Sequence, residues 1–281
     1  MEGLAPEVIA GLREQRDRLR AARIERFRQD QRIGLLMHGL ARDTDQLLRS
    51  LWKAAGMPTD WALFAVGGYG RGELQPYSDV DLLLLAPEPS QPASHLPAAT
   101  IACIERFIGA CWDIGLEIGH SVRTPSQCAQ SAHDDISTMT ALLERRQLTG
   151  NRRAARLLSE AMAGQLALPL FIRDKLLEMR QRHQKYEDTP YSLEPNCKES
   201  PGALRDLQVV AWISRAAGLG QAWVSLVRAG VIEPLEASQL QRYERLLKRI
   251  RAWLHILAGR REDRLIFDLQ PAVAQAMHLP G

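Results

Sequence analysis

The sequence predicts an α+β fold, in which a small β-sheet with flanking helices is followed by an all-helical segment. Three short apolar runs, residues 61–66, 80–85 and 116–122, have the length and the flanking turns of buried strands. Most of the remaining chain shows the apolar periodicity of amphipathic helices. The fold class therefore rests on three strands in the first half of a mainly helical chain.

Helices are expected before, between and after these strands. Two long helices precede the first strand, and the helical pattern returns after the second and the third. The expected ranges are 12–28, 33–55, 101–114, 136–148, 152–163, 169–186, 204–217 and 238–257. We divide the chain into N-terminal helices (1–60), a sheet-containing segment (61–150) and a helical segment (151–281).

Composition and charge exclude several classes of protein. The 281 residues are 46% hydrophobic and 25% charged, which is typical of a globular chain and not of a disordered or fibrous one. A net charge of +3 is too small to indicate non-specific binding to nucleic acid. No apolar run has the length of a membrane span, the N-terminus lacks a signal-peptide pattern, and the four cysteines lack disulfide or zinc spacing. We therefore expect a cytoplasmic protein without a membrane partner.

Two carboxylates stand at the start of the second predicted strand. Asp79 and Asp81 are two residues apart, so their side chains project from the same face of the strand. The residues that follow are apolar, which indicates a strand covered on both sides with its acidic end at a rim. Two carboxylates at one rim can hold divalent metal ions for in-line displacement at phosphorus. An isolated pair of this kind is more often a solvated strand end.

A glycine-rich segment directly precedes the two aspartates. Gly67, Gly68, Gly70 and Gly72 fall within six positions after the first strand, and glycines let successive backbone N–H groups form an anion-binding concavity. We also expect a short helix that begins near Arg71 and directs its N-terminal amides at the same anion. The segment matches neither a Walker loop nor a complete dinucleotide fingerprint. The combination of glycine-rich loop and aspartate pair predicts a metal-dependent phosphate site.

These motifs resemble a known superfamily. The segment GGYGRGEL (67–74), followed by SDVD (78–81), is similar to the DNA-polymerase-β-type nucleotidyltransferases, and within them to the PII-protein uridylyltransferase (bifunctional uridylyltransferase/uridylyl-removing enzyme) family. Further similar segments follow in order along the chain. They are residues 117–124 (EIGHSVRT), 135–150, 194–206 (EPNCKESPGALRD) and 254–267. Because the matches are ordered and span most of the chain, the chain is identified as a member of this family.

The resemblance implies a fold and a reaction. The implied fold is a nucleotidyltransferase domain with a small mixed β-sheet at 61–150, N-terminal helices (1–60) that pack on it, and a helical linking and nucleotide-binding domain at 151–281. Members transfer UMP from UTP to a tyrosine of the PII nitrogen-regulatory protein, release diphosphate and use Mg²⁺ or Mn²⁺. The family's HD and ACT domains have no counterpart in these 281 residues, so we expect no uridylyl-removing activity from this chain.

The resemblance also implies roles for individual residues. Asp79 and Asp81 are expected to be catalytic and to hold the metal, and Glu117 is the first candidate for a third catalytic carboxylate, with Asp113 and Asp135 as alternatives. Nucleotide-binding residues are expected both in the glycine-rich segment and in the helical segment. They are Gly67, Gly68, Gly70, Arg71, Ser78, Asn196, Lys198 and Arg205.

Several alternatives stay open at this point. No residue decides between UTP and ATP, and the acceptor could be an RNA end or a small molecule, although the sequence lacks the interleaved aromatic and basic residues of an extended nucleic-acid groove. A non-catalytic nucleotide-sensing module is a further alternative, and the intact aspartate pair argues against it. Ser200 and Ala203 stand where the family motif has glycines, so this turn has less conformational freedom.

Overall fold

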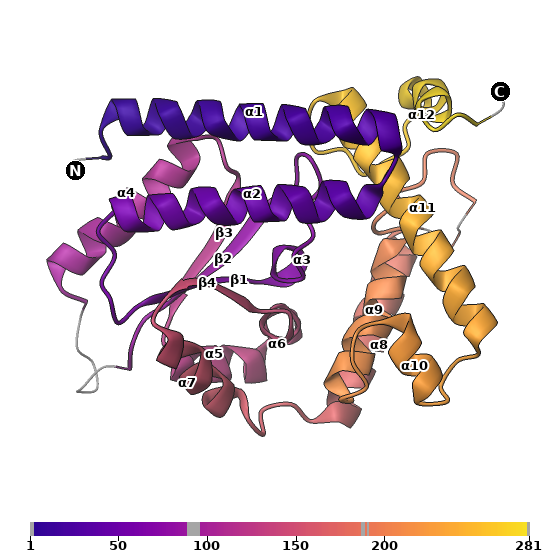
Figure 1. The fold of residues 1–281 in the computed structure, drawn as a ribbon. Helices are drawn as coiled ribbons and strands as arrows, with labels where there is room; N and C mark the ends of the chain where they lie inside the picture. Colours follow the sequence, from indigo (N-terminus) through magenta and orange to yellow (C-terminus); the bar gives the residue numbers. More distant parts are fainter. Residues whose placement is uncertain (1–2, 89–95, 187–188, 190, 280–281) are drawn as a thin grey trace. The chain divides into compact units, whose positions relative to one another are not determined.

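The computed structural model describes residues 3–88, 96–186, 189 and 191–279 (Figure 1). The chain divides into two compact units. The first unit consists of Met1–Glu25, Leu35–Leu74 and Ser78–Gln165, and the second of Arg26–Gly34, Gln75–Tyr77 and Leu166–Gly281. The first unit contains the β-sheet, whereas the named elements in the described part of the second unit are all helices.

A small mixed sheet forms the centre of the first unit. Its strands are β1 (Ala62–Ala65), β2 (Val80–Leu85), β3 (Ile118–Arg123) and β4 (Arg146–Gly150), in the order β3–β2–β1–β4 (Figure 1). β1 pairs antiparallel with both β2 and β4, whereas β2 pairs parallel with β3. The α+β class with a small mixed sheet, as predicted, is therefore confirmed for the described residues.

The two central strands are buried on both faces. All four residues of β1 are buried, and β2 is buried at every position except Asp81. Continuous apolar runs of this kind are what a doubly covered strand requires. This explains why the strands predicted from the sequence agree closely with the observed bounds of β1 and β2.

The predicted helix at 136–148 is wrong over its second half. Helix α6 (Ile136–Leu143) ends before Glu144, and the chain then forms β4. Within β4 only Leu148 is buried, and the register against β1 shifts between Leu63 and Phe64. A short edge strand with one buried residue and an irregular register has no two-residue apolar alternation, so its sequence did not distinguish it from the end of a helix.

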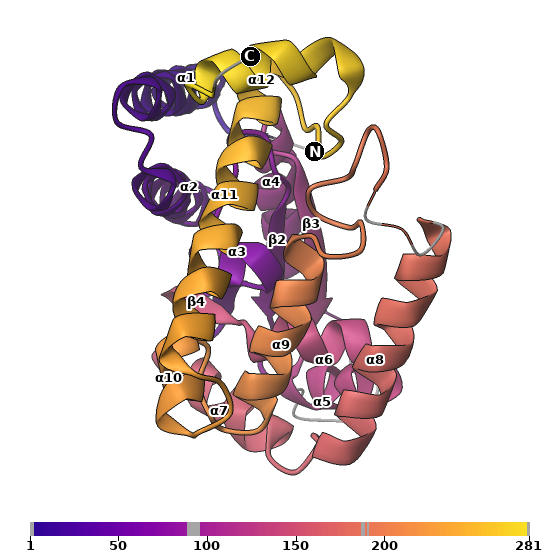
Figure 2. The ribbon, with the colours of Figure 1, turned by 90° about the vertical axis from the view of Figure 1, so that its right-hand side faces the viewer.

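Helices cover the sheet within the first unit. α1 (Pro6–Asp30) and α2 (Ile33–Ala54) run beside each other in both views (Figures 1 and 2). Arg23 of α1 forms an ion pair of 2.8 Å with Asp43 of α2. The remaining helices of this unit are α3 (Gly67–Gly70), α4 (Ala98–Asp113), α5 (Pro125–Asp134), α6 and α7 (Arg152–Met162). Because α7 packs on α5 and β1, the first unit extends beyond the boundary near residue 150 that the sequence suggested.

The second unit is a group of helices. α9 and α11 run alongside each other, and α10 packs against α11 (Figure 2). Its helices are α8 (Leu168–Lys185), α9 (Leu204–Ala216), α10 (Trp223–Arg228), α11 (Pro234–Ala258), the 3₁₀ helix η1 (Phe267–Leu269) and α12 (Gln270–Ala276). α11 begins with a capping box of Glu233 and Glu236 and ends at Gly259, whose φ of 66° is left-handed. Among the helices of the described chain, none combines the length and apolar character that a bilayer span requires.

Candidate functional site

The side chain of Asp81 occupies a space that two glycines leave open. Asp81 is opposite Gly119 in the parallel pairing of β2 and β3, and a Cβ at Gly119 would stand 2.6 Å from Asp81 Oδ1. On the other side, a Cβ at Gly67 would stand 3.5 Å from Asp81 Oδ2. The carboxylate therefore lies close to the backbone of the glycine-rich segment and of β3 together.

Asp79 lies immediately before β2 and is half-buried. Val80, between the two aspartates, is buried, and alternation along the extended chain places both acids on the face opposite Val80. Ser78 precedes this pair in the same segment of the first unit. The strand thus presents two carboxylates at its start, and Asp81 is the exposed residue of an otherwise buried strand.

The glycine-rich segment is a single helical turn, not a loop followed by a helix. α3 spans Gly67–Gly70, and Arg71 is its C-cap, so the expected helix beginning near Arg71 is wrong. Gly67 has a φ of 57°, which favours glycine. A Cβ at Gly70 would stand 2.0 Å from the carbonyl oxygen of Glu144. Gly67 and Gly70, which are predicted to bind nucleotide, are therefore also favoured as glycines by the backbone conformation and by the lack of space for a Cβ.

Arg71 is held by two carboxylates. Its Nη1 donates to both carboxylate oxygens of Glu144, at 2.8 and 2.7 Å, and its Nε donates to Glu73 at 3.4 Å. Burial lowers the pKa of Arg71, but the charges of Glu144 and Glu73 outweigh it and raise the pKa overall. This ion pair joins the turn after α3 to the residue that follows α6, so a phosphate at Arg71 would have to share the guanidinium with Glu144.

Tyr69 anchors the same turn on α2. Its hydroxyl donates to Asp45 Oδ1 at 2.6 Å, and Arg146 of β4 donates to the same carboxylate at 2.6 and 3.1 Å. Arg146 Nη2 also donates to the carbonyl oxygen of Tyr69 at 3.3 Å. Burial and the charge of Asp45 raise the pKa of Tyr69, so the hydroxyl stays protonated as a donor. Neither Asp45 nor Glu144 was predicted as a site residue from the sequence; a carboxylate on the buried face of an amphipathic helix was the available signal for Asp45.

The structure distinguishes among the candidates for a third carboxylate. Glu117 is exposed, its carbonyl accepts the N–H of Val80 at 2.9 Å, and it lies two residues before the register partner of Asp81. Asp135 is the N-cap of α6, and its side chain accepts the N–H groups of two residues of that helix. The exposed Asp113 at the end of α4 accepts a hydrogen bond from Arg13 Nε at 3.0 Å through its carbonyl. Of the three, Glu117 is adjacent to the start of β2.

Asp79 and Asp81 of the first unit fit a divalent cation whose remaining ligands are oxygen atoms of the substrate. No group of three His, Cys, Asp or Glu side chains in the described residues is arranged to hold a metal ion by itself. Mg²⁺ is commonly bound by one or two carboxylates together with phosphate oxygens. Asp79 and Asp81 supply that donor set, and Asp81 stands in the space between Gly67 and Gly119.

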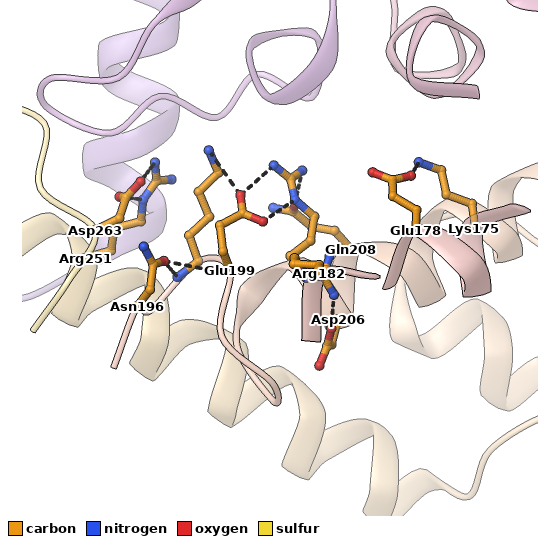
Figure 3. Close-up of polar contacts among 11 residues, drawn as sticks. Lys175, Glu178, Arg182, Asn196, Glu199, Asp206, Gln208, Arg251 and Asp263 are labelled. Carbon is orange, nitrogen blue, oxygen red and sulfur yellow. Dashed lines mark hydrogen bonds and ion pairs between the residues drawn. The ribbon is translucent and has the colours of Figure 1, made fainter. Parts of the chain in front are cut away.

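In the second unit, Asn196 organises the turn that carries Lys198. Its Oδ1 accepts the N–H groups of Lys198 and Glu199 at 2.9 and 2.8 Å (Figure 3). Its own N–H donates to Ser200 Oγ at 2.9 Å. Asn196 also forms an isolated bridge with Arg264. The hydroxyl of Ser200, at a position where the family motif has glycine, is thus part of the turn.

Lys198 and Arg205 share one carboxylate. Glu199 Oε1 lies 3.6 Å from Lys198 Nζ and 3.0 Å from Arg205 Nη2. Burial, together with the charges of Arg251 and Arg205, lowers the pKa of Lys198. The pKa of Glu199 is lowered as well: burial opposes this, and the hydrogen bond and charge of Arg205 outweigh the burial. Lys198 and Arg205 thus form a positively charged group with Glu199 as its counter-ion. Such a group is suited to bind a phosphate in place of the Glu199 carboxylate.

Asp206 ties this turn to α8. Its carboxylate accepts a hydrogen bond from Arg182, lies 2.9 Å from His183 Nε2 and accepts the N–H of Gly202 at 2.7 Å. Arg205 donates instead to Gln208 Oε1 at 2.9 Å and lies over the Trp212 ring, 5.3 Å from its centroid. The predicted nucleotide-binding residues Asn196, Lys198 and Arg205 therefore belong to one local network of the second unit.

Two family models match the chain. A nucleotidyltransferase domain matches residues 46–138, which include Asp79, Asp81 and Glu117. The GlnD PII-uridylyltransferase model matches residues 170–281, which include the predicted nucleotide-binding residues of the second unit. The two matches cover both groups of candidate site residues.

Curated relatives are similar to nearly the whole chain. Bifunctional uridylyltransferase/uridylyl-removing enzyme from Cupriavidus pinatubonensis is 53% identical over 275 residues, covering 96% of this chain and 31% of the relative. Its counterparts in Bordetella parapertussis and Ralstonia nicotianae are 50% and 52% identical over 94% and 93% of this chain, and 30% of each relative is covered. The chain thus spans less than a third of the length of these relatives. The resemblance inferred from the motifs is confirmed: residues 46–138 match a nucleotidyltransferase domain, and the chain is a homologue of the bifunctional uridylyltransferase/uridylyl-removing enzymes.

Proposed function

We propose that this chain is a metal-dependent nucleotidyltransferase that transfers UMP from UTP to a tyrosine hydroxyl of a PII protein and releases diphosphate. The observation that carries the proposal is the placement of Asp81 between Gly67 and Gly119, inside the matched nucleotidyltransferase domain. The names of the relatives support the choice of UMP and of PII. Because the reaction consumes a nucleoside triphosphate, its proposed place is the cytoplasm.

In this mechanism Asp79 and Asp81 hold Mg²⁺ or Mn²⁺, and Glu117 is the third catalytic carboxylate. The cation supplies charge neutralisation of the triphosphate and polarisation of the reacting oxygens. Asp81 is suited to this role because its carboxylate lies close to the backbone of both β3 and α3, which limits the positions that the carboxylate can take. Asp79, half-buried before β2, supplies the second set of oxygens.

Backbone and side-chain donors are proposed to bind the nucleotide. In the first unit these are the amides of Gly67, Gly68 and Gly70, with Ser78 and Arg71. In the second unit, Lys198 and Arg205 are proposed to bind phosphate by taking it in place of Glu199 as their counter-ion, and Asn196 to hold the turn and contact the nucleotide. A phosphate that replaces one carboxylate keeps both cations neutralised, which lowers the cost of binding.

Labelling with two forms of radioactive UTP tests the proposal. UTP labelled at the α-phosphate, with Mg²⁺ and a PII protein, is expected to label the PII protein, whereas UTP labelled at the γ-phosphate is not, because the nucleotidyl group is transferred. ATP and CTP in parallel determine the base preference. Transfer to other acceptors but not to PII would contradict the assigned acceptor.

Variants of the aspartate pair test the assigned metal ligands. Asp79→Asn/Asp81→Asn is expected to lower the transfer rate by about 10²–10³-fold or more, because electrostatic stabilisation of the transition state is lost. Asp134→Asn is the matched control, since Asp134 is an exposed acid of α5 that hydrogen-bonds Gln130. Normal transfer by the double variant would show that the metal site lies elsewhere.

A further inference from the structure

Three residues between the glycine-rich segment and the aspartate pair belong to the second unit. These residues, Gln75–Tyr77, are here called the strap; the chain on either side of them is part of the first unit. Gln75 is buried, and its Nε2 donates to the carbonyl oxygen of Lys248 at 3.3 Å. The N–H of Tyr77 donates to His255 Nδ1 at 3.3 Å. Both partners lie on α11, so this helix holds the strap through one hydrogen bond at each end.

His255 is arranged as a neutral imidazole with both nitrogens used. Its side chain is fully buried, and Nδ1 accepts the hydrogen bond from Tyr77. Nε2 lies 3.2 Å from Asp263 Oδ1. A neutral imidazole has one acceptor and one donor nitrogen, so the proton must be on Nε2 and point at Asp263. Burial lowers the pKa of His255, which is consistent with a neutral ring.

Asp263 connects His255 to the turn that carries Lys198. Its carboxylate accepts a hydrogen bond from Arg251 Nε at 2.5 Å, and its backbone carbonyl accepts the N–H of Cys197 at 2.8 Å. Figure 3 shows Asp263 and Arg251 beside Asn196 in this network. The hydrogen bonds therefore run without interruption from the strap through His255 and Asp263 to the Cys197 backbone.

We propose that His255 is a positioning residue for nucleotidyl transfer. It holds the strap by accepting the Tyr77 N–H, and the strap in turn positions the segment of chain that leads into Asp79 and Asp81. The carboxylate of Asp263 favours the His255 tautomer with the proton on Nε2, which leaves Nδ1 free to accept the Tyr77 N–H. The backbone carbonyl of Asp263 holds the turn at Cys197. His255 acts through Tyr77 and touches no reacting atom. The inference rests on the proposed function, because that function assigns Asp79 and Asp81 to the metal.

Three variants separate this role from a purely structural one. His255→Leu removes the acceptor, whereas His255→Asn keeps an oxygen near the position of Nδ1. His133→Leu is the control, since His133 is an exposed histidine near the end of α5. We expect His255→Leu to lower kcat by about 10–10²-fold with a smaller change in the KM for UTP, because a displaced catalytic group mainly costs orientation. His255→Asn is expected to recover most of that loss.

Measurements without turnover keep the inference separate from the proposed function. Hydrogen exchange of the Tyr77 amide is expected to be faster in His255→Leu than in the wild type and His133→Leu. Binding of Mn²⁺, measured by electron paramagnetic resonance, is expected to weaken several-fold in the same variant. Nitrogen-15 NMR of the imidazole at neutral pH is expected to show the Nε2–H tautomer for the signal that His255→Asn removes.

The outcomes that overturn the inference are equally specific. A wild-type kcat in His255→Leu, an unchanged Tyr77 exchange rate or an Nδ1–H tautomer would each overturn it. If the wild-type chain transfers no nucleotide to any acceptor and binds no Mn²⁺, the proposed function fails and the positioning role fails with it. If both are present and His255→Leu changes neither, only the role of His255 fails.

Discussion

The carboxylate of Asp81 lies beside Gly119, its register partner on the neighbouring parallel strand, on the side where any other residue would carry a Cβ. That Cβ would stand 2.6 Å from Asp81 Oδ1, closer than two such atoms can approach. The atom in the way is the end of a side chain and not backbone. Relief of the clash therefore moves the carboxylate and leaves the sheet in place.

Gly119→Ala is accordingly expected to lower activity much more than stability. A displaced carboxylate no longer positions the proposed metal, and a misplacement of about 1 Å can cost about 10²-fold in rate. We expect a decrease of that order in the transfer rate, with a urea unfolding midpoint close to wild type. Gly109→Ala in α4 is the control, because a Cβ there meets no atom within 4 Å. Equal activity of the two variants would show that the position of Asp81 is not critical.

Glu144→Gln is expected to destabilise the first unit. Glu144 is the buried partner of Arg71, with 2% of its side chain exposed, and the variant would leave the guanidinium without its main counter-charge. Removal of one charge from a buried ion pair typically lowers the free energy of unfolding by about 3 kcal/mol. Urea unfolding of the chain measures this, with Glu160→Gln as control, because its ion pair with Arg156 is exposed. A cost below about 0.5 kcal/mol, as expected for the control, would contradict the structural role of the pair.

Glu199→Gln is expected to strengthen nucleotide binding. Glu199 neutralises Lys198 and Arg205, and the lowered pKa of Glu199 keeps it charged at neutral pH. Without this competitor, phosphate oxygens meet two cations, and we expect the Kd for UTP, measured by calorimetry, to fall several-fold with a steeper salt dependence. Lys198→Met is expected to raise the same Kd. Asp268→Asn, which removes an exposed acid of the second unit, serves as control; an equal effect there would indicate net charge alone.

Protonation of His255 is expected to destabilise the second unit below neutral pH. The pKa of this buried imidazole is lowered in the folded chain, chiefly by burial and also by the charges of Arg251 and Arg261, which outweigh the hydrogen bond and charge of Asp263. The unfolded state therefore binds the proton more readily, and stability falls as the pH decreases below the ordinary value of about 6.5. The loss levels off once the folded imidazole is protonated.

Unfolding measured between pH 5 and 8 tests this sign. The slope contributed by one histidine is at most about 1.4 kcal/mol per pH unit. It should be present in the wild type and absent in His255→Asn. The carboxylate of Asp263 does not contribute in this range, because its pKa is lowered and its effect is confined to more acidic conditions. Identical slopes for wild type and variant would exclude a buried neutral His255.

Local patterns in the sequence were enough to locate the central strands, most of the helices and the two aspartates. Burial on both faces of β1 and β2 demands continuous apolar runs, and the two-residue spacing of Asp79 and Asp81 places both on one face whatever surrounds them. The ordered motifs also led to the nucleotidyltransferase resemblance, since each motif is a contiguous run of residues.

The tertiary structure alone decided which residues meet across the chain. The pairing of Arg71 with Glu144, the space that Gly119 leaves for Asp81, the edge strand β4 and the hydrogen bond from Tyr77 to His255 all join residues far apart in sequence. None of them is encoded by a local period or spacing. They depend on strand register, close backbone approach and the need of buried polar groups for partners, and these are determined only when the chain has folded.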